Sequence, residues 1–111
     1  MNLRIGIDIG STTVKVVVLD EQNNLLFRSY ERHFSKVREK TCEILERIKD
    51  KLLGHQVQMV ITGSAGLGVS KASGIDFVQE VYATAAAVDT FIPGTDAVIE
   101  LGGEDAKIIY F

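Results

Sequence analysis

Two apolar, strand-like segments near the amino terminus are separated by a short polar turn, and this arrangement constrains the fold more than any other feature. The segments are Leu3–Asp8 and Val14–Asp20, and the second is rich in valine, whose β-branched side chain favours strands. The residues between them supply an acidic group, a glycine and three hydroxyls, within GIDIGSTTVK. A simple hairpin needs only a turn such as Asn-Gly, so these polar groups indicate a binding function.

Strand and helix signals continue along the chain. A strand at Leu25–Arg32 follows the polar stretch DEQNN, and we expect it to fold back antiparallel at a sheet edge because it carries several charges. A helix follows, with Ser35 as its expected N-cap and Gly54 as its stop. Its apolar face has helical spacing and consists of Val37, Thr41, Ile44, Leu45, Ile48 and Leu52.

The second half of the chain repeats the alternation of strands and helices. The expected elements are strands at 57–62 and 75–78, a helix at 79–90 ended by Pro93 and Gly94, and strands at 97–101 and 107–111. The glycine-rich stretch TGSAGLG, residues 62–68, lacks the GxGxxG order of a dinucleotide fold. We interpret it as a backbone turn near a nucleotide. The element order predicts an α/β fold with a mixed sheet flanked by helices.

The amino-acid composition excludes several classes of function. A net charge of −3 over 111 residues provides no basic surface for nucleic acid, and no apolar run reaches the ~18 residues of a membrane span, so we expect a cytoplasmic protein. A single cysteine, Cys42, excludes an internal disulfide, and we expect it to be a buried small residue beside the helical apolar stripe. His33 and His55 have no metal partners at useful spacing, and neither is assigned a function.

The first turn has the groups that a phosphate and its metal ion require. Gly10 lets the backbone approach a ligand closely, the following amides can bind phosphate oxygens, and Asp8 can hold Mg²⁺ through water. The candidate phosphate ligands are Gly10, Ser11, Thr12, Thr13 and Lys15. A capped turn beside a snorkelling lysine explains the same residues without a ligand, and the turn alone does not decide between these interpretations.

A second turn repeats the pattern of strand, acidic residue, glycine and strand. It lies about ninety residues later, in ELGGEDAK. Two such turns facing each other can hold a triphosphate and its metal from two sides, which favours the phosphate interpretation. Its candidate residues are Glu100, Gly102, Gly103, Glu104 and Asp105.

GIDIGSTTVK and ELGGEDAK resemble the two phosphate motifs of the acetate kinase, sugar kinase, heat-shock chaperone and actin superfamily. Within it, the chain resembles the BadF/BadG/BcrA/BcrD-type ATPases, which activate 2-hydroxyacyl-CoA dehydratases and benzoyl-CoA reductases. RHFS (residues 32–35), TGSAGLG and ELGGEDAK support this likeness, which covers essentially all 111 residues. The resemblance implies a ribonuclease H-like, actin-like ATPase domain at residues 1–93 and the opening hairpin of a truncated second domain at 94–111.

The resemblance also implies roles for the candidate residues, with ATP and Mg²⁺ as cofactors. Asp8 and Glu100 would organise the metal, both glycine turns and Lys15 would bind phosphates, and Glu104 or Asp105 would place the attacking water. Two residues depart from the family pattern. Glu100 stands where Asp is usual, and Glu104 stands where Gln is usual; a glutamate there is a stronger base than glutamine but repels a γ-phosphate.

Further implications concern a longer protein, because the chain ends within a strand-like run (KIIYF) and we expect it to be a fragment. The resemblance implies a [4Fe–4S] cluster between two identical subunits, with cysteine ligands beyond the second motif, and electron transfer to a 2-hydroxyacyl-CoA dehydratase or related CoA-enzyme. For these 111 residues alone we expect very weak ATP affinity and negligible turnover. A sugar or metabolite kinase and an actin-like or reactivase-type interaction protein remain alternatives.

Overall fold

A computed structural model describes residues 2–101 and 106–111 of the chain. The chain divides into two compact units, residues 1–77 and residues 78–111, and each is described here by itself. The first unit carries GIDIGSTTVK, and the second carries ELGGEDAK.

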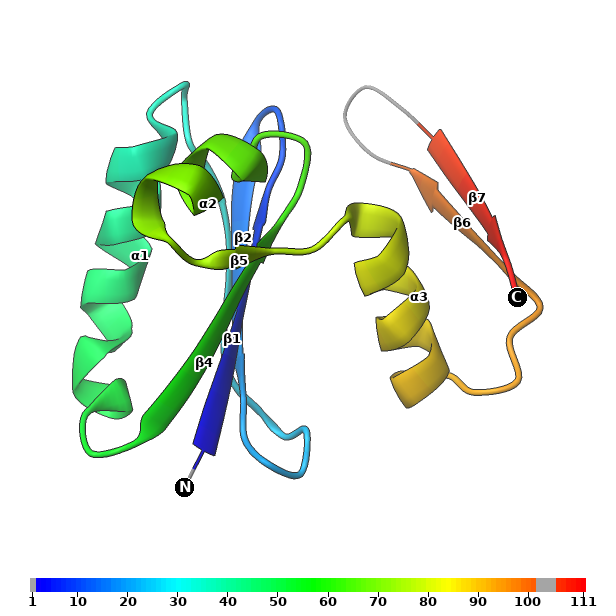
Figure 1. Cartoon of the computed structure of the whole chain (residues 1–111), viewed down its shortest axis with the longest axis horizontal. Coiled ribbons are helices and arrows are strands. Elements are labelled where there is room, and N and C mark those ends of the chain that lie inside the picture. Colours follow the sequence, from blue (N-terminus) through cyan, green and yellow to red (C-terminus); the bar gives the residue numbers. More distant parts are fainter. Residues whose placement is uncertain (1, 102–105) are drawn as a thin grey trace. The chain divides into compact units, whose positions relative to one another are not determined.

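The first unit is built on a five-stranded mixed sheet with the order β3-β2-β1-β4-β5 (Figure 1). Antiparallel pairing joins β1 to β2 and β2 to β3, whereas β1 to β4 and β4 to β5 are parallel. The strands are β1 (Asn2–Ile9), β2 (Thr13–Leu19), β3 (Leu25–Arg32), β4 (Gln56–Thr62) and β5 (Asp76–Phe77). The mixed sheet and the antiparallel third strand at its edge are therefore confirmed.

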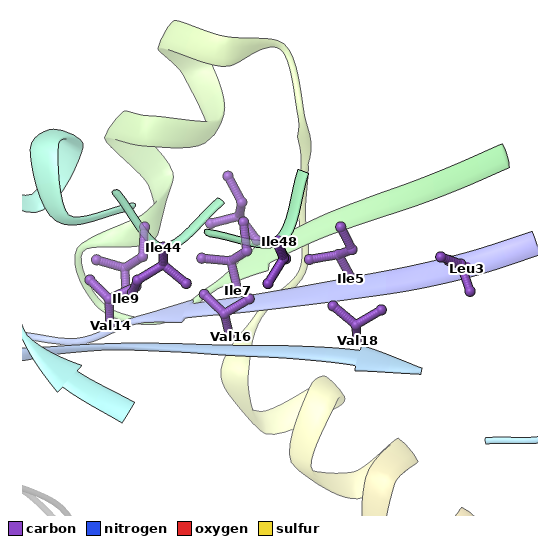
Figure 2. Close-up of a cluster of buried hydrophobic side chains, with 10 residues drawn as sticks. Leu3, Ile5, Ile7, Ile9, Val14, Val16, Val18, Ile44 and Ile48 are labelled. Carbon is purple, nitrogen blue, oxygen red and sulfur yellow. The ribbon is translucent and has the colours of Figure 1, made fainter. Parts of the chain in front are cut away.

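One face of this sheet forms the core of the unit. Alternate side chains of β1 and β2 point to the same face and pack against α1 (Val37–Leu52), as Figure 2 shows. The alternation follows from the two-residue period of a strand. The buried cluster consists of Leu3, Ile5, Ile7, Ile9, Val14, Val16, Val18, Ile44, Ile48 and Ile61. The predicted apolar face of α1 is confirmed, since Val37, Leu45 and Leu52 pack against this cluster.

The start of α1 differs from the prediction. Ser35 is not the N-cap, because the helix begins at Val37 after Lys36, and no side chain caps it. Ser35 has a left-handed backbone (φ 62°), and its amide donates to the ring of His33. The predicted stop is confirmed: α1 ends at Leu52, and Gly54 has a positive φ of 80°.

A helix that the sequence did not predict follows β4. The stretch interpreted as a turn leads directly into α2 (Gly66–Ser73), which lies on the same side of the sheet as α1 in Figure 1. Gly66 fits tightly against the sheet, since a Cβ there would lie 2.8 Å from Ile61 Cγ2. Gly74 ends the helix in the left-handed conformation, with its amide bonded to the Ser70 carbonyl.

The second unit contains α3 (Glu80–Phe91) and an antiparallel pair of strands, β6 (Ala97–Leu101) and β7 (Ala106–Tyr110). These bounds match the predicted helix and the two predicted strands closely. Among the described residues, no helix is long and apolar enough to cross a membrane.

Candidate functional site

The acidic and basic groups of the first motif lie side by side at the end of the sheet. Asp8 on β1 and Lys15 on β2 are antiparallel register partners, and Lys15 Nζ lies 3.5 Å from Asp8 Oδ2. Both side chains are partly exposed, at 37% for Asp8 and 41% for Lys15. The Lys15 ammonium also lies 5.1 Å from the centre of the Tyr30 ring, within range of a cation–π contact. Solvent-exposed pairs of this kind are weak, so either group can exchange its partner for a ligand.

The turn between these strands leaves backbone donors exposed. The amide of Gly10 donates to the carbonyl of Thr13 at 2.9 Å and closes the turn. In the part of the chain that the structure describes, the amides of Ser11 and Thr12 donate to no other group, and both residues are exposed. Exposed backbone donors beside a glycine are suited to binding an anion.

The parallel strand β4 pairs with β1 and packs beside Asp8. Thr62 is the register partner of Asp8, so both side chains lie on the same face. The Thr62 hydroxyl oxygen is buried and has no hydrogen-bond partner among the described residues. Gly63, with φ 102°, approaches so closely that a Cβ would lie 2.2 Å from the Ile9 carbonyl oxygen and 2.6 Å from Asp8 Oδ1. The amide of Ala65 then donates to the Ile9 carbonyl at 2.9 Å.

The sequence reasoning missed His33, which lies beside the same turn. Its ring Nε2 is 3.0 Å from the Gly10 carbonyl oxygen, and only 5% of the residue is exposed. The only local hint was its place in RHFS, because its partner Gly10 is far away in the sequence. The other histidine, His55, is exposed near the start of β4.

The described part of the second motif lies on β6 and β7. Glu100 is the register partner of Lys107, and its Oε2 accepts a hydrogen bond of 3.1 Å from the Thr84 hydroxyl on α3. Lys107 forms an ion pair with Glu80, at the start of α3. The remaining predicted residues, Gly102, Gly103, Glu104 and Asp105, lie outside the described residues.

The donor set at the first turn suits a hydrated magnesium ion. Mg²⁺ prefers oxygen ligands and retains several waters, and Asp8 supplies a partly exposed carboxylate beside the unpartnered Thr62 hydroxyl. Across residues 2–101 and 106–111, no three His, Cys, Asp or Glu side chains gather as a metal cluster. An iron–sulfur cluster does not fit this chain, because such clusters need several cysteine ligands and the sequence has one.

The expected burial of Cys42 is wrong, whereas its expected position beside the apolar stripe of the helix is correct. Its side chain is exposed and lines a groove of about 570 Å³ between α1 and α2, together with Arg38, Ala65 and Val69. Cys42 follows Thr41, one of the buried positions of α1, and the helical rotation of about 100° per residue carries it to the edge of the buried stripe.

A network of ion pairs joins β3 to α1. Arg47 contacts the Glu31 carboxylate with both terminal nitrogens, and Nη2 lies 2.7 Å from Oε1. Lys40 Nζ lies 3.6 Å from the same carboxylate. The Arg47 hydrogen bonds, then the one from Ser29, lower the pKa of Glu31 to about 2. This network fixes the edge strand that leads into His33.

Comparison with known proteins identifies the family of the chain. The model of the BadF/BadG/BcrA/BcrD ATPase family matches residues 5–111. The chain belongs to this family. It is 26% identical over 106 residues to the uncharacterized protein MJ0004 of Methanocaldococcus jannaschii, which covers 95% of this chain and 42% of that relative.

Two solved structures share the fold over nearly the whole chain. The activator of the 2-hydroxyisocaproyl-CoA dehydratase from Clostridium difficile, solved with bound ADPNP, aligns with a TM-score of 0.79 and 27% identity over 97% of this chain and 40% of its own. Component A of the Acidaminococcus fermentans (R)-2-hydroxyglutaryl-CoA dehydratase aligns with the same TM-score and 21% identity, over 99% and 43%. The predicted actin-like ATPase fold is confirmed, and the chain spans less than half the length of these relatives.

Proposed function

We propose that this chain supplies one side of the nucleotide site of an ATP-hydrolysing activator, whose partner is a 2-hydroxyacyl-CoA dehydratase or related CoA-enzyme. Family membership and the likeness to an activator bound to ADPNP support this proposal. The observation that carries it is the exposed turn beside the Asp8–Lys15 pair. Electron transfer through an iron–sulfur cluster and a homodimer belong to the longer protein in this proposal.

Each group of the first motif has a defined task. The exposed amides of Ser11 and Thr12 bind phosphate oxygens, with Gly10 allowing the close approach. Lys15 leaves Asp8 and turns its ammonium to a phosphate, which frees the carboxylate. The Asp8 carboxylate would then hold a hydrated magnesium ion through its water ligands. When bound, Mg²⁺ neutralises phosphate charge that builds up during hydrolysis.

In this proposal the second motif also supplies groups for the nucleotide and its metal ion. Glu100 would help to hold the metal ion, and the glycines Gly102 and Gly103 would bind phosphate. Glu104 or Asp105 places the attacking water. The ion pair between Lys107 and Glu80 and the hydrogen bond between Thr84 and Glu100 keep the described part of this motif in place within its unit.

The proposal is tested by adding Mg²⁺ with a non-hydrolysable ATP analogue to the ¹⁵N-labelled chain and following its amide signals. We expect weak binding, with shifts concentrated at residues 8–15. Lys15→Met should weaken binding about tenfold or more, because it removes one charge-assisted hydrogen bond. Lys49→Met is the matched control, since Lys49 is exposed and pairs only with Glu46 among the contacts that the structure describes. Unshifted turn amides, or equal affinity of the two variants, would overturn the proposal.

A further inference from the structure

His33 contacts the phosphate turn through both its ring and its backbone. Ring Nε2 lies 3.0 Å from the Gly10 carbonyl oxygen, and the backbone amide of His33 donates to the Thr12 carbonyl at 3.0 Å. The residue is nearly fully buried. Two of the turn's carbonyl groups therefore have the same histidine as their partner.

The second ring nitrogen fixes the protonation of the first. The Ser35 amide donates to His33 Nδ1 at 3.1 Å, so Nδ1 is an acceptor and carries no proton. In the neutral ring the proton is then on Nε2. Nε2 therefore donates to the Gly10 carbonyl.

The loop after β3 is shaped around this ring. Phe34 and Ser35 both have left-handed backbone angles, with φ of 51° and 62°, which residues other than glycine seldom adopt. The amide of Lys36 donates to the His33 carbonyl at 2.8 Å and closes the loop. This unusual backbone is what brings the Ser35 amide to the ring.

A hydrogen bond that fixes the orientation of a carbonyl group also fixes the orientation of the amide that follows it. A trans peptide unit is planar, and its C=O and N–H point in opposite directions. No cis peptide bond occurs among the described residues. With the Gly10 carbonyl bound to the ring, the Ser11 amide points away from His33. The Thr12 carbonyl fixes the Thr13 amide in the same way.

We infer that His33 is a positioning residue, whose ring aims the Ser11 amide of the β1–β2 turn at a bound phosphate. The inference rests on the proposed function, because it assigns the task of the turn to phosphate binding. His33 does not touch the phosphate in this arrangement. Its ring acts through the Gly10 carbonyl.

The ring state is measured first, in the chain without nucleotide. A long-range ¹H–¹⁵N correlation spectrum distinguishes the two neutral ring forms, and we expect His33 to carry its proton on Nε2. The orientation of the Ser11 N–H bond, measured by residual dipolar coupling, is then compared between the wild-type chain and His33→Ala. We expect it to change in the variant, because the Gly10–Ser11 peptide unit loses its ring partner. The Thr13 N–H bond is the internal control, since the backbone amide at position 33 still donates to the Thr12 carbonyl.

Two further variants separate the two ring contacts. His33→Gln places an amide donor near the position of Nε2, whereas His33→Asn places its polar group near Nδ1 and is too short to reach the Gly10 carbonyl. We expect His33→Ala and His33→Asn to weaken binding of the Mg²⁺–ATP analogue about tenfold, and His33→Gln to stay within about threefold of wild type. His55→Gln, at an exposed histidine, is the matched control and should bind as wild type does.

The outcomes separate this inference from the proposed function. A ring protonated on Nδ1, an unchanged orientation of the Ser11 N–H bond in His33→Ala, or equal binding by the Gln and Asn variants would each overturn the positioning role. If the wild-type chain binds no nucleotide, the proposed function fails, and the ring form and the Ser11 N–H orientation still decide whether His33 orients the turn. If His33→Ala does not fold, the Gln and Asn variants provide the comparison.

Discussion

The β1–β2 and β6–β7 hairpins carry similar motifs, but their strands have different surroundings within their own units. Alternate residues of β1 and β2 are buried in the core beneath α1. On β6 and β7, Ile99, Ile108 and Tyr110 are each more than half exposed, at 68%, 58% and 79%. The comparison teaches that a motif predicts the chemistry of a turn, whereas the packing of the strands determines how firmly the turn is held. The first turn is held by its own unit.

The largest effect should come from the core beneath the first hairpin. Ile44→Ala removes a fully buried side chain and should destabilise the first unit by about 2–5 kcal/mol. Ile108→Ala, at a residue that is 58% exposed, should cost less than about 1 kcal/mol. Urea unfolding followed by amide signals of each unit measures both changes. An equal loss of unfolding free energy in the two variants would show that the two hairpins do not differ in how strongly their strands are packed.

A smaller effect is expected where β4 approaches the first motif. Gly63→Ala adds a Cβ at 2.2 Å from the Ile9 carbonyl oxygen, at a φ of 102°, and should cost about 2–4 kcal/mol from backbone strain and crowding. Gly54→Ala is the matched control, because Gly54 also has a positive φ but nothing lies within 4 Å of an added Cβ. It should cost about 1–2 kcal/mol. The difference between the two unfolding free energies reports the close contact, and a Gly63 variant no worse than its control would contradict this account.

The smallest effect concerns the charges that tie β3 to α1. The pKa of Glu31 is lowered from 4.5 to about 2 in the folded chain. A lowered carboxyl pKa stabilises the fold above pH 4.5, and this contribution is lost as the pH falls towards 2. Glu31→Gln should therefore reduce stability at pH 7 and flatten the loss of stability below pH 4.5.

Urea midpoints measured between pH 7 and pH 2.5 test this expectation. Glu46→Gln is the control, because Glu46 pairs with Lys49 on the exposed side of the same helix, with 68% of its side chain accessible. A control variant that flattens the acid profile as much as Glu31→Gln would show that Glu31 has no special role in holding the edge strand.

Much of the fold could be predicted because its signals are local. Valine-rich runs, a helical apolar stripe and glycine stops fix the strands and α1 within a few residues of their observed bounds. The helix α2 was missed because glycine and serine are poor helix formers, and four of its eight residues are of these types. Its packing against Ile61 and Phe77 and its cap at Gly74 decide its existence. The sequence signals that could have indicated the end of this helix were Gly74 at its cap and Lys71 in its last turn.

The residues of the candidate site likewise fall into those that local sequence patterns predict and those that they do not. Asp8, Gly10 and Lys15 could be found from their spacing, because they lie on one hairpin. His33, Thr62 and Gly63 come to the turn only through β3 and β4, and no local pattern indicates such contacts. Ser35 has a preferred N-cap side chain, yet its amide is used by the His33 ring instead. Tertiary contacts therefore overrode local preferences where the turn is supported.

The parallel pairing of β1 with β4 has a consequence for the order in which the molecule is assembled. Asp8 and Thr62 become neighbours only after β2, β3 and α1, which lie between them in the sequence, have been accommodated. Closing so long a connection costs chain entropy and slows folding. A nascent chain that has been synthesised as far as α1 contains the whole of GIDIGSTTVK but lacks β4, the strand that pairs with β1 beside the Asp8 carboxylate. GIDIGSTTVK is thus complete before the strand that supports Asp8 from the other side has been synthesised.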